Sequence, residues 1–190
     1  MANREVAVPD EFFVRLREMT AIGQSERVDL IDAGGRGFLS IELGVLGRDE
    51  EITDQNGVLV GKMQDRMHIE GIKGYRSRNL LDGKGKLIGR AMPKVPDPKP
   101  GERHYFLNDE NNSTIALAVT TQEIYPVDVE IRSGDGSSVL SRMNRNFDQK
   151  STMAGLDKTP IYKISINSNQ VPRLLMHEFI VSLFLFVLKA

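Results

Sequence analysis

The basic side chains in the middle of the sequence are its best candidates for binding chemistry. Arg76 and Arg78 alternate along one stretch, and Lys84 and Lys86 alternate along the next. If the two stretches are neighbouring strands, alternate residues point to the same side, and the four cations share one outer face. Such a face suits a phosphate or an anionic head group. A solvated lysine face that protects a strand edge is the other interpretation, and the sequence leaves both open.

Catalytic and metal-binding patterns fail on spacing. His68, His104 and His177 are too scattered for a recognisable metal set, because no two of them stand at i and i+4 or flank a single residue. Residues 57–62 look like a phosphate-binding loop, but three residues separate the two glycines where four are needed. The sequence therefore predicts no catalytic residue, no metal site and no cofactor, and a protein that is not an enzyme.

The composition excludes further classes of function. The chain has 190 residues, with 25 Lys and Arg against 26 Asp and Glu and a net charge of -1. This balance lacks the basic excess that non-specific nucleic-acid binding needs. The absence of cysteine excludes a disulfide framework and fits a reducing compartment. Since no basic region followed by an apolar run opens the sequence, we expect a cytoplasmic protein, with peripheral attachment to a membrane as an option.

An internal repeat carries most of the information about the fold. Residues 52–62 and 80–90 align without gaps as apolar, any, Asp, any, any, Gly, any, Leu, Val or Ile, Gly, Lys or Arg. Weaker copies follow the same outline at residues 30–39, 106–116 and 130–140. Asp and a positive-φ Gly at this spacing are typical of a β-hairpin turn. Five units predict a meander of about ten to twelve antiparallel strands, with Gly57 and Gly85 in equivalent positive-φ positions.

Two segments lie outside this repeat. Residues 10–19 fit a strand as well as a short helix, so the N-terminal extension and first strand at residues 1–26 stay undecided in type. Residues 92–101 hold four prolines and predict an extended surface loop, because proline fits neither a central strand nor a helix. The repeat continues across this loop, so we expect one domain over residues 1–190.

The C-terminal segment predicts a buried helix at residues 172–188. Pro172 suits the first turn, and from Phe179 to Leu188 only Ser182 is polar, so the helix is apolar on all sides. The apolar run is much shorter than the roughly 20 residues that a bilayer span needs. Burial in protein is therefore favoured over a tail anchor, and no transmembrane span is expected.

A closed barrel of about twelve strands offers the place for this helix. Such a barrel is wider than the eight-strand size that its own side chains fill, and a central helix fills the remaining space. The predicted fold class is therefore mainly β, a closed antiparallel barrel threaded by the C-terminal helix. His177 and Glu178 then predict a polar ring at the mouth where the helix enters.

The hairpin repeats and the final hydrophobic helix, over residues 27–188, resemble the tubby C-terminal-like superfamily. The chain length suits its LURP-one-related branch, next to the scramblase-like proteins. The resemblance implies a twelve-stranded barrel threaded by its last helix and a non-enzymatic binding module. Tubby domains bind phosphoinositides through basic surface side chains, which implies anionic membrane lipid as a partner. No basic pair of that family aligns here. A structural or regulatory domain of the same fold, binding a protein partner and no lipid, is the alternative.

Overall fold

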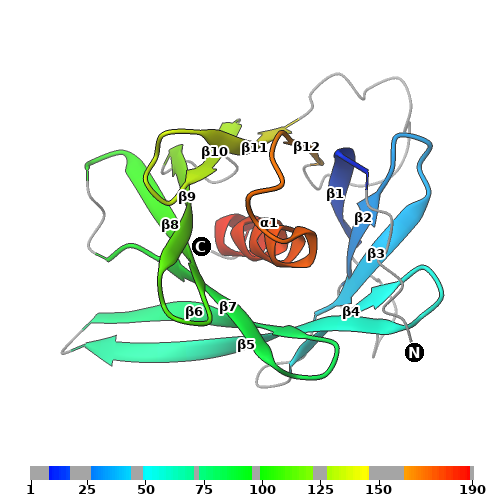
Figure 1. Cartoon of the computed structure of the whole chain (residues 1–190), viewed down its shortest axis with the longest axis horizontal. Helices are drawn as coiled ribbons and strands as arrows, with labels where there is room; N and C mark the ends of the chain where they lie inside the picture. The colour runs from blue at the N-terminus through cyan, green and yellow to red at the C-terminus, as the bar shows by residue number, and fades with distance from the viewer. Residues whose placement is uncertain are drawn as a thin grey trace.

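The computed structural model describes residues 9–17, 27–43, 49–70, 73–95, 99–121, 128–145 and 161–188. Within these residues, the strands form a closed antiparallel barrel of twelve, and one helix lies inside it (Figure 1). The predicted fold class is confirmed.

The strands follow the chain around the barrel, and pairing of β1 with β12 closes it. Their bounds are β1 Glu11–Arg17, β2 Arg27–Ile31, β3 Gly37–Glu42, β4 Glu50–Asp54, β5 Leu59–Glu70, β6 Lys73–Asp82, β7 Leu87–Pro93, β8 Glu102–Asp109, β9 Thr114–Thr121, β10 Asp128–Ser133, β11 Val139–Arg145 and β12 Tyr162–Ile166. The helix, α1, is Arg173–Leu188.

Five hairpin turns share one geometry, as the repeat predicts. Gly57 and Gly85 have φ angles of 75° and 81°, which confirms their equivalent positions. Their amides donate to the carbonyls of Asp54 and Asp82 at 3.0 and 2.8 Å, and each Asp side chain accepts two further amides of its own turn. The same position in the other turns also has positive φ and is occupied by Gly35, Asn112 and Gly136.

All five turns lie at one end of the barrel, because connections in an antiparallel meander alternate between its two ends. We call this the turn end and the opposite one the far end. The helix begins at the turn end, where Arg173 Nη2 lies 2.5 Å from Asp10 Oδ1 beside the start of β1. It ends toward the far end, where the Phe186 ring stacks on Tyr105 at 5.4 Å between centroids.

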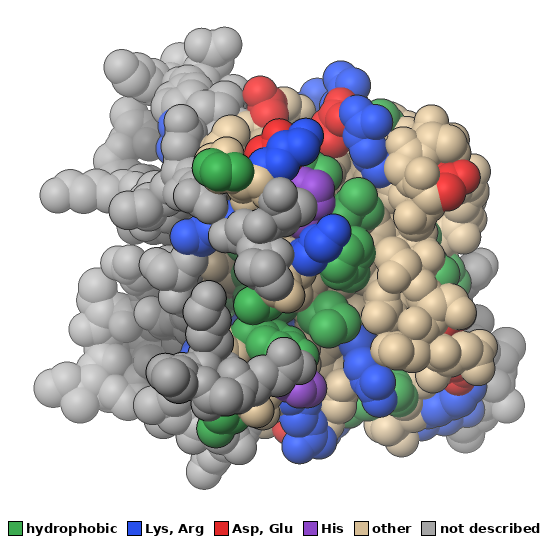
Figure 2. All heavy atoms as spheres, turned by 90° about the vertical axis from the view of Figure 1, so that its left-hand side faces the viewer, with side chains coloured by type: hydrophobic (Ala, Val, Ile, Leu, Met, Phe, Trp, Pro, Cys, Tyr) green, Lys and Arg blue, Asp and Glu red, His purple; other side chains and the backbone are tan. Residues whose placement is uncertain are grey.

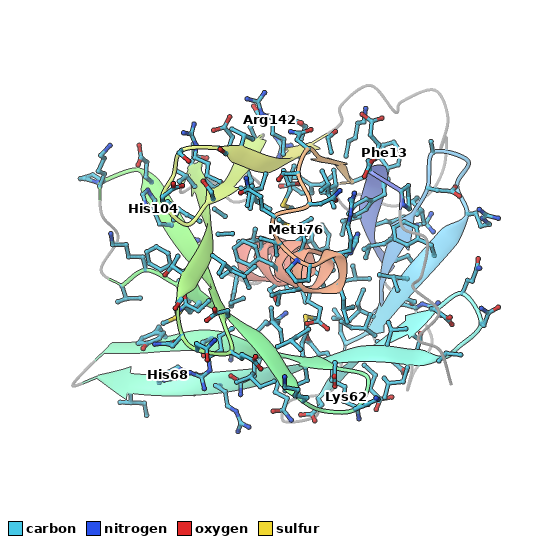
Figure 3. All side chains as sticks on the ribbon, viewed as in Figure 1. Phe13, Lys62, His68, His104, Arg142 and Met176 are labelled. Atoms are coloured by element: carbon cyan, nitrogen blue, oxygen red, sulfur yellow. The ribbon has the colours of Figure 1, made fainter. Side chains whose placement is uncertain are left out.

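The helix is enclosed on all sides, as its apolar sequence predicts. Every side chain from Leu175 to Leu185 is buried, and side chains from the wall and the helix fill the space between them (Figure 3). Lys62 and Arg142 in the same view point outward. The wall comes close at Gly89, where an added Cβ would lie 2.7 Å from Leu175 Cδ1. No helix in the described ranges is both long and apolar enough to cross a membrane.

The structure bears on the two segments that lie outside the repeat. Residues 11–17 form a strand, which decides the choice left open for the N-terminal segment, while residues 18–26 lie outside the described part. The expected loop at 92–101 begins later, because β7 includes Met92 and Pro93. Proline is accepted there because the β6 ladder ends at the Arg78–Ala91 pair, so no described partner strand requires its missing amide hydrogen.

Placing a charge on the enclosed helix should unfold the protein. Leu183 and Phe184 are each 1% exposed, so Leu183→Asp or Phe184→Asp buries a carboxylate without a partner and should remove several kcal/mol, comparable to a domain's whole stability. Val58→Asp, at a position 58% exposed, is the control. Circular dichroism and size-exclusion chromatography provide the measurement. A helix variant with the melting temperature of the wild type would contradict the enclosed position.

Candidate functional site

Arg78 lies inside the barrel, so its predicted place on an outer face is wrong. It is 4% exposed and alternates with Leu80, which is fully buried. Its Nε lies 2.8 Å from Asp65 Oδ1 and its Nη1 3.2 Å from Glu50 Oε2. The guanidinium also lies over the Phe186 ring, 5.4 Å from its centroid. Arg78 thus closes the far end of the core with a compensated charge and is not available to a ligand.

Lys84 and Lys86 lie in the β6–β7 turn, so their predicted placement on a strand is also wrong. The turn occupies these positions because the Asp82 carboxylate accepts both of their backbone amides at 2.9 Å. The Lys86 ammonium pairs with Glu110 at 2.8 Å, and this partner raises the pKa of Lys86. The side chain of Lys84 is exposed.

Arg76 is exposed and lies near the far end, six residues along β6 from the turn. At about 3.3 Å per residue, this separates it from Asp82 by about 20 Å. The four predicted cations therefore do not share one face. One is buried, two lie at the turn end, and only Arg76 belongs to the part of β6 that leaves the barrel.

The β5–β6 hairpin projects beyond the barrel wall. The ladder of β5 with β4 ends at the Met63–Glu50 pair, and that of β6 with β7 ends at Arg78–Ala91. Pairing between β5 and β6 continues to residues 70 and 73. The two-stranded part extends about 17 Å past Arg78, and Figure 1 shows it reaching out at the lower left. We call residues 66–70 and 73–76 the hairpin tip.

Two large apolar side chains of the hairpin tip are exposed. Met67 is 59% and Ile69 77% exposed. They continue the row that includes Met63, which is fully buried against the helix, but this row loses its cover where the barrel ends. Val95, which follows the far-end terminus of β7, is 46% exposed. Figure 2 shows hydrophobic side chains across the middle of the face in view, with Lys and Arg among them and most Asp and Glu toward its margins.

Arg66 and Arg76 of the hairpin tip lack carboxylate partners within the described part of the chain. Arg66 Nη2 donates to the amide oxygen of Gln64 at 3.1 Å, and no ion pair of Arg66 or Arg76 is found there.

His68 connects the two strands of the hairpin, because its ring stacks on Tyr75 at 4.8 Å and its Nε2 lies 2.6 Å from the Ser77 hydroxyl. Figure 3 shows His68 and His104 on the same side of the molecule.

The turn end has the opposite electrostatic character, because every hairpin turn carries an aspartate. Backbone amides of the turns, those of Arg36 and Val58 first, lower the pKa values of Asp32 and Asp54. The Ser133 hydroxyl is the main cause that lowers the pKa of Asp135 to about 2. These three carboxylates stay ionised at neutral pH, so negative charge gathers at the turn end, whereas Arg66 and Arg76 lie toward the far end.

His177 and Glu178 are enclosed in the barrel instead of forming a polar ring at its mouth. They are 2% and 0% exposed, and none of their polar side-chain atoms makes a hydrogen bond of normal geometry with a described residue. The His177 ring lies 5.1 Å from that of Phe12, between centroids. Glu178 faces Gly61, where an added Cβ would overlap its carboxyl group. In the described ranges, no group of three ligating side chains gathers for a metal ion.

Burial decides the protonation of this interior pair. It lowers the pKa of His177 to about 4, outweighing the nearby carbonyl of Arg173. It raises the pKa of Glu178 well above its usual value, and Asp82 adds to the effect. Both groups are therefore neutral inside the barrel at neutral pH, and they are closed off from solvent. This arrangement suits a packed interior and not a solvent-accessible catalytic site.

Sequence reasoning missed Arg66, Met67 and Ile69 as site residues. The spacing of the turn aspartates gives no clear signal, because Asp54 and Asp82 are 28 residues apart and Asp82 and Asp109 are 27 apart. The pattern alone places Met67 and Ile69 on the core side of a strand. Only the ends of the neighbouring ladders show that they lie beyond the core.

Comparisons with known proteins identify neither a family nor a function for this chain. No protein family model matches the chain, and no curated protein matches it. Among solved structures, it is similar to the X-ray structure of protein AT5G01750 from Arabidopsis thaliana, with 13% sequence identity and a TM-score of 0.33. The match covers 93% of this chain and 89% of that chain. A likeness with so low a TM-score carries no argument about family or function.

Mutation of the two arginines of β6 should change the stability of the protein to very different extents. Arg78→Gln removes the buried guanidinium that pairs with Glu50 and Asp65, so the free energy of unfolding should fall by about 3–5 kcal/mol. Arg76→Gln changes an exposed side chain and should alter it by no more than about 0.5 kcal/mol. Urea denaturation of both variants measures the difference. Equal stability of the two would mean that Arg78 is not part of the barrel's closure.

Acid should destabilise the protein through His177. The folded pKa of about 4 lies below the ordinary 6.5, so the unfolded chain binds the extra proton and stability is lost as pH falls between these values. The loss is about 3 kcal/mol. His177→Leu should remove this part of the pH dependence, whereas His104→Leu, at a site on the outside of the barrel, is the control. Unfolding free energies across this range test it, and an unchanged slope in His177→Leu would refute it.

Proposed function

We propose that the protein is a non-enzymatic binding module that attaches to anionic phospholipid head groups through the hairpin tip. The observation that carries this proposal is the exposure of Arg66 and Arg76, without carboxylate partners in the described part of the chain, on a hairpin that projects past the barrel. Each cation near an anionic membrane contributes about 1 kcal/mol. Screening reduces the attraction over about 8–10 Å at physiological salt, so cations must reach the surface, and projection gives them that reach.

The separation of charge along the barrel supports one orientation. The ionised carboxylates of Asp54 and Asp135 in the turns face away from the surface, and the hairpin tip faces it. The chain as a whole has a net charge of -1, so attraction to a membrane depends on this orientation and not on overall charge. In this proposal the attachment is peripheral and salt-sensitive, and the protein is cytoplasmic.

We further propose that the chain is a divergent member of the tubby C-terminal-like superfamily, in its LURP-one-related branch. Three features support this: the closed barrel of twelve strands, the helix inside it, and the five equivalent hairpin turns. The shared feature with tubby domains is then the use of basic surface side chains for anionic lipid, here on different elements from those that the sequence indicated.

Loss of the two arginines should weaken binding to vesicles. Arg66→Gln with Arg76→Gln removes about 2 kcal/mol, so the affinity for mixed phosphatidylcholine and phosphatidylserine vesicles should fall about thirtyfold. Vesicle sedimentation across a salt series measures it, and wild-type binding should weaken as salt rises.

Lys84→Gln with Lys86→Gln is the matched control, because it removes the same charge at the turn end. We expect its affinity to stay within about twofold of the wild type. If the lysine pair lowers affinity and the arginine pair does not, the binding face is the β6–β7 turn. If the wild type does not bind phosphatidylserine or phosphoinositide vesicles, the lipid proposal is wrong, and a protein partner becomes the better hypothesis.

A further inference from the structure

We propose that Met67 and Ile69 insert into the interfacial layer of an anionic bilayer, below the head groups that Arg66 and Arg76 contact. The inference rests on the proposed function and adds an apolar anchor to it. The protein is then held by burial of side chains as well as by charge. The hairpin tip is the anchor, and the barrel remains in water.

The order of residues along the hairpin tip fits an interfacial anchor. Met67 pairs across the ladder with Arg76, so the thioether and the guanidinium lie on the same face of one rung. Ile69 is nearer the tip and pairs with Gly74, which has no side chain to cover it. Of the two described apolar side chains, the more exposed Ile69 therefore lies farther out than Arg76, and a long arginine side chain can reach phosphates while its stem lies along apolar surface.

The exposure of these side chains has no explanation within the described fold. Met67 is 59% and Ile69 77% exposed, although they belong to the strand row that begins with the buried Gly61 and Met63. Below them, the Arg78 pairs and the Phe186 ring close the core, so the two side chains are outside it. Neighbouring exposed apolar side chains with cations beside them are typical of membrane or protein interaction sites.

The hairpin tip favours a bilayer over a protein groove as its occupant. It is a convex, projecting ribbon with cations on both strands, and its backbone is paired internally up to residues 70 and 73. Internal pairing matters because unpaired amides are costly in hydrocarbon. The apolar side chains therefore enter while the ribbon stays at head-group depth. Anionic lipid complements Arg66 and Arg76, and lipid needs no preformed pocket.

A single introduced tryptophan can report on membrane insertion by its fluorescence, because the chain contains no tryptophan and no cysteine of its own. Met67→Trp introduces a single indole at the hairpin tip. Val58→Trp is the matched control, because Val58 is 58% exposed but lies at the turn end. On mixed phosphatidylcholine and phosphatidylserine vesicles, Met67→Trp should show a blue-shifted emission and quenching by brominated acyl chains. Val58→Trp should show neither.

A second measurement separates insertion from charge. Met67→Ser with Ile69→Ser should lower the affinity for the same vesicles about tenfold or more, with the melting temperature unchanged since both sites are exposed. Its remaining binding should depend on salt more steeply than that of the wild type in relative terms, because charge alone then holds the protein.

The outcomes distinguish insertion from the proposed function. Vesicle binding by Met67→Trp with water-exposed emission and no quenching would overturn insertion and leave charge-based attachment in place. Equal quenching at Val58→Trp would overturn the orientation. No vesicle binding by the wild type would overturn both proposals, and binding of the serine variant at wild-type affinity would overturn insertion alone.

Discussion

The enclosure of an all-apolar helix by twelve strands is the constraint on which the rest of the structure depends. A barrel of this size has an interior that its own side chains do not fill. Helix α1 supplies the missing volume, and in return the wall removes an apolar segment from water. Close approach is made at Gly61 and Gly89, where any Cβ would overlap Glu178 or Leu175. The position of the helix therefore fixes which wall positions must be small.

The same constraint determines the chemistry of the far end. The described interior ends at Phe186, and a charged layer of Arg78, Glu50 and Asp65 covers it. Strands β5 and β6 continue past this layer and leave Met67 and Ile69 without cover. The surface that we propose for membrane attachment thus arises because two strands are longer than the core that they enclose.

The aspartates of the hairpin turns give the turn end of the barrel its negative charge. An aspartate that accepts amides of its own turn stabilises each hairpin. In the first two turns these amides also lower the pKa values of Asp32 and Asp54, which favours their ionised form. Because all these turns lie at one end, a purely local device makes that end acidic. The lysines of the β6–β7 turn are balanced by Glu110 and by the surrounding aspartates, so their number in the sequence overstates the attraction they exert.

The sequence by itself determined the hairpins, their positive-φ glycines, the buried helix and hence the closed barrel. These follow from local chemistry: Asp and Gly at fixed spacing shape a turn whatever surrounds it, and an all-round apolar helix requires an all-round cover. Only the tertiary structure decided that Arg78 is inside, that Lys84 lies in a turn, and that Met67 and Ile69 are exposed. Alternation along a strand gives two faces, but which face meets the core, and how far the core extends, depends on the neighbouring strands and on the end of the helix.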